Sequence, residues 1–145
     1  MEHTVQPIDN FRPAIYGVLI QRDEILLVRA TQTFQGFVGF PGGGIEPGEA
    51  PLAALHREFA EETGLAIEPV RVLWATAGLH RSRMNPQRQM LGIYWEVRET
   101  GGNFKPAGNG EDVAAAFFCP LHAIPVGEML EVDREVLHLL STHGR

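Results

Sequence analysis

The apolar positions along the chain fall mostly into short runs separated by polar turns. Runs rich in β-branched and aliphatic residues are typical of buried strands. On this basis strands are predicted at residues 14–20, 25–30, 68–77, 90–97 and 113–119. The polar turn at residues 21–24 predicts that the first two strands form a hairpin.

Two other stretches have the period of a helix. In the first, Leu52, Leu55 and Phe59 recur at helical spacing. Pro51 suits its first turn, because a missing N–H costs nothing there, and Gly64 suits the position just after its end. The second stretch, residues 127–140, carries its apolar side chains on one face: Met129, Leu130, Val132, Val136, Leu137 and Leu140.

The remaining segments are connections. Residues 1–12 are polar and predict a loose lead-in, and residues 31–40 are a connection with three phenylalanines. Residues 79–89 and 99–112 contain many turn-forming side chains and predict loops. With no repeat and no long linker, the chain is expected to be a single domain, residues 1–145. Hairpins mixed with helical connections predict an α/β fold with a mixed sheet.

Three carboxylates in the first helical stretch share one face. Glu58, Glu61 and Glu62 stand at i, i+3 and i+4, beside the apolar stripe. Like charges at this spacing repel by a few tenths of a kcal/mol. Arg57 alone cannot neutralise three glutamates, whereas a divalent cation can. Hard oxygen ligands favour magnesium, manganese or calcium over zinc or copper. The alternative is a solvated acidic face, which is common on helices.

The spacing around these carboxylates is more specific than the carboxylates themselves. The pattern G-x5-E-x7-R-E-U-x-E-E-x-G-U, with U a bulky apolar residue, is filled at every fixed position, by Gly43, Glu49, Arg57, Glu58, Phe59, Glu61, Glu62, Gly64 and Leu65. This is the Nudix box, so the sequence resembles the Nudix hydrolase family. The resemblance implies a Nudix fold, an α/β/α sandwich with a mixed sheet, over the whole chain.

The resemblance also implies a reaction and a set of ligands. Nudix hydrolases cleave a nucleoside diphosphate linked to another group, by attack of water on phosphorus with the help of divalent metal ions. By resemblance, Glu58, Glu61 and Glu62 are the metal ligands, and the Gly42 carbonyl is a further candidate. Mg²⁺ is the expected cofactor, with Mn²⁺ as an alternative. Arg57 and Glu49 are expected to orient the ligands.

The general base is open at this stage. A box glutamate, Glu58 or Glu61, serves in some family members, and a carboxylate from a distant loop serves in others. The distant candidates here are Glu111 and its neighbour Asp112. His80 is a further candidate base, although a single histidine in a loop more often has no catalytic role. Some family members carry a glutamate just before an aromatic pair like Phe117–Phe118, but this chain has Ala116. That departure removes one expected ligand position.

Four further side chains are candidates for contact with the substrate. Arg29 and Arg81 could neutralise phosphates, although a surface ion pair or a solvated loop explains them equally well. Phe34 and Phe37 could stack on a base, although aromatic side chains at such spacing more often belong to the core.

Composition limits the partners and the compartment. The net charge of −6 argues against a nucleic-acid partner and favours a small nucleotide or diphosphate substrate. The single cysteine, Cys119, lies in an apolar run and predicts a buried side chain and no internal disulfide. The sequence shows no signal peptide and no apolar run long enough to span a membrane, so cytoplasmic localisation is expected.

Three questions stay open. The signatures that mark ADP-ribose and dinucleoside polyphosphate hydrolases downstream of the box are not met, so the substrate is open. The alternative function is a catalytically silent Nudix-like module that senses a nucleotide; such modules usually have an eroded box. A homodimer could form through an edge strand or the phenylalanine-rich segment.

Overall fold

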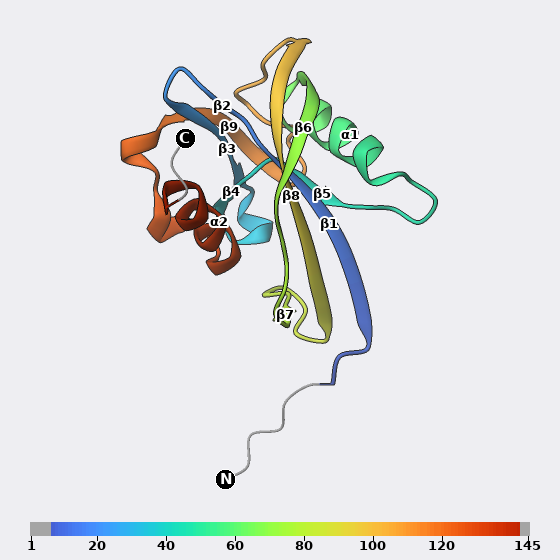
Figure 1. The fold of residues 1–145 in the computed structure, drawn as a ribbon. Coiled ribbons are helices and arrows are strands. Elements are labelled where there is room, and N and C mark those ends of the chain that lie inside the picture. The colour runs from blue at the N-terminus through green and yellow to red at the C-terminus, as the bar shows by residue number, and fades with distance from the viewer. Residues whose placement is uncertain (1–6, 143–145) are drawn as a thin grey trace.

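The computed structural model describes residues 7–142, which form two β-sheets and two α-helices (Figure 1). The strands are β1 (Asn10–Val18), β2 (Ile20–Gln21), β3 (Glu24–Ala30), β4 (Val38–Gly39), β5 (Gly42–Gly44), β6 (Leu65–Ala75), β7 (His80–Arg81), β8 (Arg88–Gly102) and β9 (Val113–Pro120). The helices are α1 (Pro51–Thr63) and α2 (Glu131–Thr142), and short 3₁₀ turns lie at Gln32–Phe34, Leu121–Ala123 and Val126–Glu128.

The larger sheet is mixed, as the sequence predicts. Its strands follow the order β5-β1-β8-β6, and β7 pairs with β8. β1 runs parallel to β8 from the pair Asn10–Arg88 to the pair Val18–Glu96, whereas β5 and β6 pair antiparallel with their neighbours. In the smaller sheet β3 pairs with β2, β4 and β9.

The first predicted hairpin is only partly right. The predicted strand 14–20 is divided between two elements. Its end falls in the two-residue strand β2, which pairs with β3 as predicted, whereas the rest of it lies in β1, which belongs to the other sheet. The chain changes sheet at Leu19, which is buried between the two. A continuous apolar run cannot reveal this change, because both sheets bury their side chains in the same way. β1 also starts earlier than predicted, at Asn10, because β8 supplies backbone partners there; residues 1–6 of the predicted lead-in lie outside the described residues.

Several other elements begin or end at residues that differ from the predicted ones. β6 and β8 extend each other to Leu65 and Gly102, so the first residues of the predicted 99–112 loop are strand. Within the predicted 79–89 loop, β7 pairs with β8. α2 begins at Glu131, after a 3₁₀ turn that occupies the predicted first helical turn. β3, β9 and α1 lie close to their predicted positions.

The two helices lie on opposite sides of the strands, which confirms the α/β/α arrangement (Figure 1). α1 packs against one apolar cluster, which contains Ile15, Leu26, Leu55 and Phe59. α2 contributes Val136 to a second cluster around Tyr94 and Phe40. Along the described residues, no helix is long and apolar enough to cross a membrane.

α1 has the ends that the sequence predicts. Pro51 stands in its first turn, and Gly64 ends it in the left-handed region with φ 78°. Phe59 is fully buried in the middle of its apolar stripe. This burial fixes the rotation of the helix, and so decides which way its glutamates point.

Replacing Phe59 tests how much the helix depends on this contact. Phe59→Ala should lower the free energy of unfolding by about 3–5 kcal/mol, because a large side chain that is 0% exposed leaves a cavity. Leu52→Ala is the matched control, since Leu52 is 36% exposed on the same helix and should cost less than about 1 kcal/mol. Urea denaturation of both variants measures the difference, and equal losses would contradict the proposed role of Phe59.

Candidate active site

The glycine-rich strand β5 lies directly against the carboxylate face of α1. A Cβ atom on Gly43 would stand 2.9 Å from the carboxyl carbon of Glu58, so a side chain at this position would displace that glutamate. The backbone N–H of Gly42 donates a hydrogen bond to Glu62 Oε1 over 3.0 Å. Gly42 has φ 149°, where its missing Cβ avoids the backbone of β1. The glycines therefore let the backbone approach two glutamates closely.

Arg57 connects the carboxylates to one another. Its guanidinium binds both oxygens of Glu49, over 2.7 Å and 3.0 Å. It also donates to Glu58 Oε1 over 3.0 Å and to the Gly44 carbonyl over 3.3 Å. The Arg57 hydrogen bonds are the largest cause that lowers the pKa of Glu49, to about 2. These contacts name the groups that Arg57 would orient in the role predicted from the sequence.

Glu58 and Glu62 form the centre of the carboxylate group. The Glu58 side chain is 12% exposed, and Glu62 is buried. Burial first, and then the nearby Glu58 carboxylate, raise the pKa of Glu62 to about 9 in spite of the opposing hydrogen bond from Gly42. Two carboxyl groups in contact without a cation between them favour a proton on one of them. A divalent cation would supply the missing positive charge, and the hard oxygen donors fit Mg²⁺ or Mn²⁺.

The structure treats the three predicted metal ligands unequally. Glu61 is 53% exposed and reaches Arg57 only over 3.4 Å, whereas Glu58 and Glu62 face the glycine-rich strand. Among the residues that the structure describes, no three His, Cys, Asp or Glu side chains converge closely enough to form a complete ligand set. Of the three predicted metal ligands, Glu58 and Glu62 are therefore the two that lie together beside the glycine-rich strand.

A cavity of about 420 Å³ opens beside this pair. Glu62 and Gly42 line it on the α1 side. Two predicted substrate contacts, Phe34 and Phe37, line it as well. So does Arg81, whose guanidinium donates to the Pro86 carbonyl over 2.7 Å. A buried carboxylate pair and aromatic side chains thus meet in one space.

Two predicted site residues lie away from the cavity. Arg29 binds Glu128 over 2.9 Å and the Gly36 carbonyl over 3.1 Å, as in the surface ion pair that the sequence left open. Glu111 is exposed and is not among the cavity-lining residues, whereas its neighbour Asp112 is. Of the two distant carboxylates considered from the sequence, Asp112 is the one whose charge helps to raise the pKa of Glu62.

Sequence reasoning missed the polar wall of the cavity formed by Asp133 and Tyr94. Asp133 is 8% exposed and accepts a hydrogen bond of 2.6 Å from the Tyr94 hydroxyl. The Tyr94 ring stacks on Tyr16 with centroids 4.9 Å apart. A signal was available: Asp133 stands four residues after Met129 and three before Val136, on the apolar face of its helix. A carboxylate on an apolar face needs an explanation.

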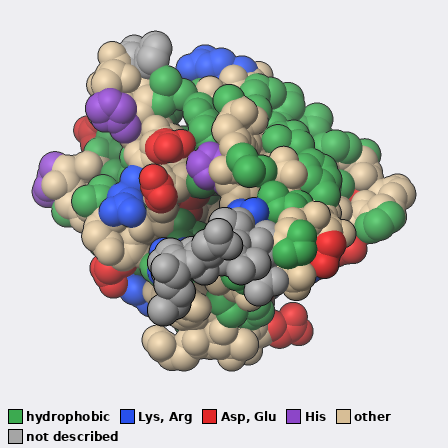
Figure 2. Space-filling model, turned by 90° about the horizontal axis from the view of Figure 1, so that it is seen from below, with side chains coloured by type: hydrophobic (Ala, Val, Ile, Leu, Met, Phe, Trp, Pro, Cys, Tyr) green, Lys and Arg blue, Asp and Glu red, His purple; other side chains and the backbone are tan. Residues whose placement is uncertain are grey.

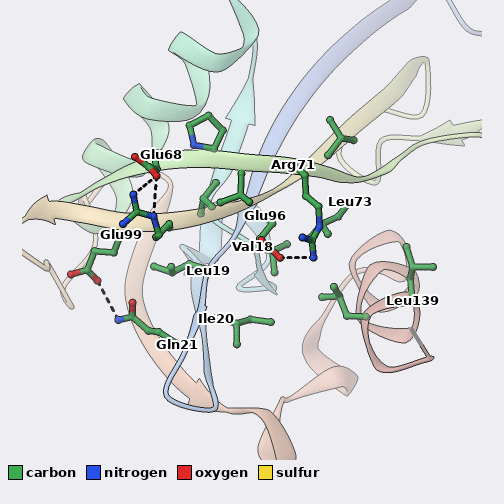
Figure 3. Close-up of a pocket in the computed structure, with 16 residues that line it drawn as sticks. Val18, Leu19, Ile20, Gln21, Glu68, Arg71, Leu73, Glu96, Glu99 and Leu139 are labelled. Atoms are coloured by element: carbon green, nitrogen blue, oxygen red, sulfur yellow. Dashed lines mark hydrogen bonds and ion pairs between the residues drawn. The ribbon is translucent and has the colours of Figure 1, made fainter. Parts of the chain in front are cut away.

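A larger cavity, of about 1020 Å³, lies between β6, β8, the β2 region and α2 (Figure 3). Four of its charged side chains form ion pairs: Arg71 pairs with Glu96 over 3.0 Å, and Arg98 pairs with Glu68. No box carboxylate lines it. The larger cavity is therefore not the candidate active site. The smaller cavity is, because a box carboxylate lines it.

Comparison with known proteins agrees with the geometry of the box. The family model of the NUDIX domain matches residues 10–140. The chain therefore belongs to the NUDIX family.

Curated proteins that match the chain include RNA pyrophosphohydrolases. The protein of this name from Pseudomonas fluorescens (strain SBW25) is 42% identical over 80 residues, which cover 55% of this chain and 49% of the relative. The one from Halorhodospira halophila (strain DSM 244 / SL1) is 39% identical over 82 residues, 57% of this chain and 44% of the relative. The chain thus matches about half the length of these relatives.

Solved structures share the fold at low identity. A MutT NUDIX hydrolase from Burkholderia pseudomallei superposes with a TM-score of 0.76 at 19% identity, covering 91% of this chain and 99% of the other. An ADP-ribose pyrophosphatase from Streptococcus suis gives a TM-score of 0.65 at 24% identity, covering 92% and 93%. These likenesses confirm the Nudix fold, and at such identities they say nothing of the substrate.

The free energy of unfolding should depend on pH through the ionisation of the buried Asp133 carboxyl. Burial raises the pKa of Asp133 from 3.8 to about 6, although the Tyr94 hydrogen bond lowers it. Because the folded pKa is the higher one, the stabilising contribution of this carboxyl is complete below pH 4 and is lost as pH rises through 6. Asp133→Asn removes this titration, so its stability relative to wild type should rise by about 2 kcal/mol between pH 4 and pH 7. Urea denaturation at both pH values measures it, and a pH-independent difference would contradict the interpretation.

Proposed function

We propose that this protein hydrolyses a phosphoanhydride bond of a nucleotide, either a nucleoside diphosphate linked to another group or a nucleoside triphosphate, with Mg²⁺ or Mn²⁺. The observation that carries the proposal is the Glu58–Glu62 pair beside the glycine-rich strand, at the wall of a cavity that aromatic side chains also line. The complete box argues against the alternative of a silent sensing module, since every fixed position of the pattern is filled in this sequence. The cytoplasm, where nucleotides are abundant, is the proposed location.

Each part of the box has a physical task in this proposal. Glu58 and Glu62 would hold the metal ion, with Glu61 and the Gly42 carbonyl as further ligands. When bound, the ion supplies positive charge that offsets the negative charge of the phosphates and activates water. Arg57 acts through the glutamates, because its contacts to Glu49 and Glu58 fix the direction in which the Glu58 carboxylate points.

A carboxylate near the phosphates must accept the proton of the attacking water. Asp112 lines the cavity and lies close enough to Glu62 to affect its charge state. Asn109 holds it in place through a hydrogen bond of 2.7 Å to Oδ1. We therefore place Asp112 ahead of Glu111 as the general base, with Glu58 and Glu61 as the alternatives within the box.

The net charge led to the prediction that nucleic acid is not a partner. That prediction loses its support, because curated relatives carry the name RNA pyrophosphohydrolase. A triphosphate at the end of an RNA and a free nucleoside triphosphate present the same reacting group. On the face shown in Figure 2, however, the Lys and Arg side chains are scattered, and they do not form one stripe. An RNA backbone needs such a basic surface, so we favour a small nucleotide that fits the 420 Å³ cavity.

A substrate panel tests the reaction class. Purified protein is offered nucleoside triphosphates, ADP-ribose, dinucleoside polyphosphates, nucleotide sugars and a 5′-triphosphorylated RNA, with Mg²⁺, Mn²⁺ or a chelator. We expect turnover of free nucleotides that a chelator abolishes. Turnover of the RNA alone would overturn the preference for small substrates. Absence of all turnover, with a nucleotide that raises the melting temperature, would overturn the enzymatic proposal in favour of sensing.

Neutralising the central carboxylates should remove activity without unfolding the protein. Glu58→Gln and Glu62→Gln each keep the side-chain shape but lose the charge that holds the metal, so kcat should fall by at least about 10²-fold. Glu99→Gln is the control, because Glu99 contacts Gln21 beside the other cavity and should leave kcat unchanged. Steady-state rates at saturating Mg²⁺ measure the effect. Near-wild-type turnover by either box variant would remove that glutamate from the proposed site.

A further inference from the structure

One face of the larger sheet is covered by α1 over only part of its length. The covered part holds Ile15 of β1 and Val97 of β8, which form a cluster with Leu55 and Phe59 of the helix. Beyond that cluster, β1 and β8 extend together past α1 toward the end of the molecule that carries β7 (Figure 1). Side chains alternate along a strand, so every second residue lies on the same face as Ile15.

The pairing of the strands identifies the side chains of this uncovered face. Along β1 and β8, Pro13 lies beside Leu91, two residues before the pair of Ile15 with Ile93. On β6, Val72 lies beside Trp95, which packs against the cluster under α1. The uncovered face thus carries six apolar side chains: Phe11, Pro13, Val72, Leu91, Ile93 and Trp95.

The uncovered face is large for a surface that meets only water. Phe11 is 56% exposed and Val72 is 50% exposed, at opposite sides of the sheet. Three strands about 4.8 Å apart and about seven residues long span roughly 300 Å² of sheet. Figure 2 shows hydrophobic side chains over one broad area on the right, the side on which α1 lies. Exposed apolar areas of this size are often interaction sites.

The edge of the same sheet is less suited to an interaction. β6 is its outermost strand, but Pro69 has no N–H to donate, and the register with β8 shifts between Pro69 and Arg71. Both features hinder the addition of another strand. The phenylalanine-rich segment is engaged elsewhere, because Phe34 and Phe37 line the candidate active site and Phe40 is buried. The face therefore fits a partner better than the two routes to a dimer that the sequence suggested.

Charge indicates which partner fits. The described strands β1, β6 and β8 place no charged side chain in the uncovered face, whereas Arg71 and Glu96 pair on the opposite side of the sheet. An acidic or basic partner would find no opposite charge here. Two copies of this chain, each with a net charge of −6, repel unless their contact avoids carboxylates. The uncovered face meets this condition, and a second copy presents the same apolar surface.

We propose that the uncovered face binds the uncovered face of a second copy, so that two larger sheets pack face to face about a two-fold axis. Such an interface is self-complementary, because each copy contributes the same side chains. Met90 and Tyr94, which alternate with Leu91 and Ile93 along β8, line the candidate active site on the opposite face. Both active-site cavities therefore stay open in the dimer. The limited area makes the dimer weak and reversible.

Sedimentation velocity on the full chain at rising concentration tests the proposal. We expect wild-type protein to pass from the mass of one copy to that of two between about 10 μM and about 1 mM, the range of small interfaces. Salt at about 0.5 M should favour the dimer, because it screens the repulsion between two negative copies. The mass of one copy at every concentration would overturn the proposal and leave the face to another protein. A mass that rises beyond two copies would overturn it as well.

A lysine in the uncovered face should prevent association. Val72→Lys and Phe11→Lys each bury an ammonium group against apolar side chains in the dimer, so the association constant should fall by at least about 10-fold. Val126→Lys is the matched control, since Val126 is 51% exposed in the 3₁₀ turn before α2 and the variant gains the same charge. It should dimerise as wild type does.

Melting temperatures show which variants are folded, and the variants that are folded decide the proposal. Unchanged association of a folded Val72→Lys or Phe11→Lys protein would overturn it, and so would an equal loss in Val126→Lys. Phe11 lies near the start of β1 and is the more exposed of the two, so its variant should fold even if Val72→Lys does not. Mass is measured without substrate, so the outcome does not depend on the proposed hydrolysis.

Discussion

The arrangement of the candidate site depends on one cation, the guanidinium of Arg57. It binds Glu49 with two hydrogen bonds and also reaches Glu58 and the carbonyl of Gly44. Arginine suits this task because its planar fork binds a carboxylate at two points and stays charged. Through these contacts one side chain ties the start of the box, the glycine-rich strand and the middle of α1 together.

Arg57 does not neutralise all the carboxylates of the box. The remaining negative charge is what a metal ion would bind. Glu62 is buried, and among the described residues it accepts a hydrogen bond from the Gly42 N–H and contacts Glu58, with no hydrogen bond from Arg57. A buried carboxylate with a raised pKa stores unfavourable electrostatic energy that a bound cation can release. The protein thus keeps a place for positive charge at the cavity wall, where the phosphates of a nucleotide would also need it.

The cavity separates two tasks. Around Glu62 and Asp112 its wall carries charge suited to phosphates and metal, and around Asp133 and Tyr94 a hydrogen-bonded pair lies among side chains that are mostly aromatic and aliphatic. α1 brings the first group and α2 the second, which makes the packing of both helices on the sheets a condition for binding one substrate.

The sequence by itself determined the α/β class, the mixed sheet, the helix from Pro51 to Gly64 and the box residues, because each rests on local spacing. Helical period alone places Glu58 and Glu62 on one face, whatever the rest of the chain does. Only the tertiary structure decided that Leu19 carries the chain between two sheets, that Asp112 rather than Glu111 faces the cavity, and that Asp133 meets Tyr94. These facts depend on contacts between segments distant in sequence, such as Tyr94 and Asp133, and local periodicity contains no information on which segments will meet.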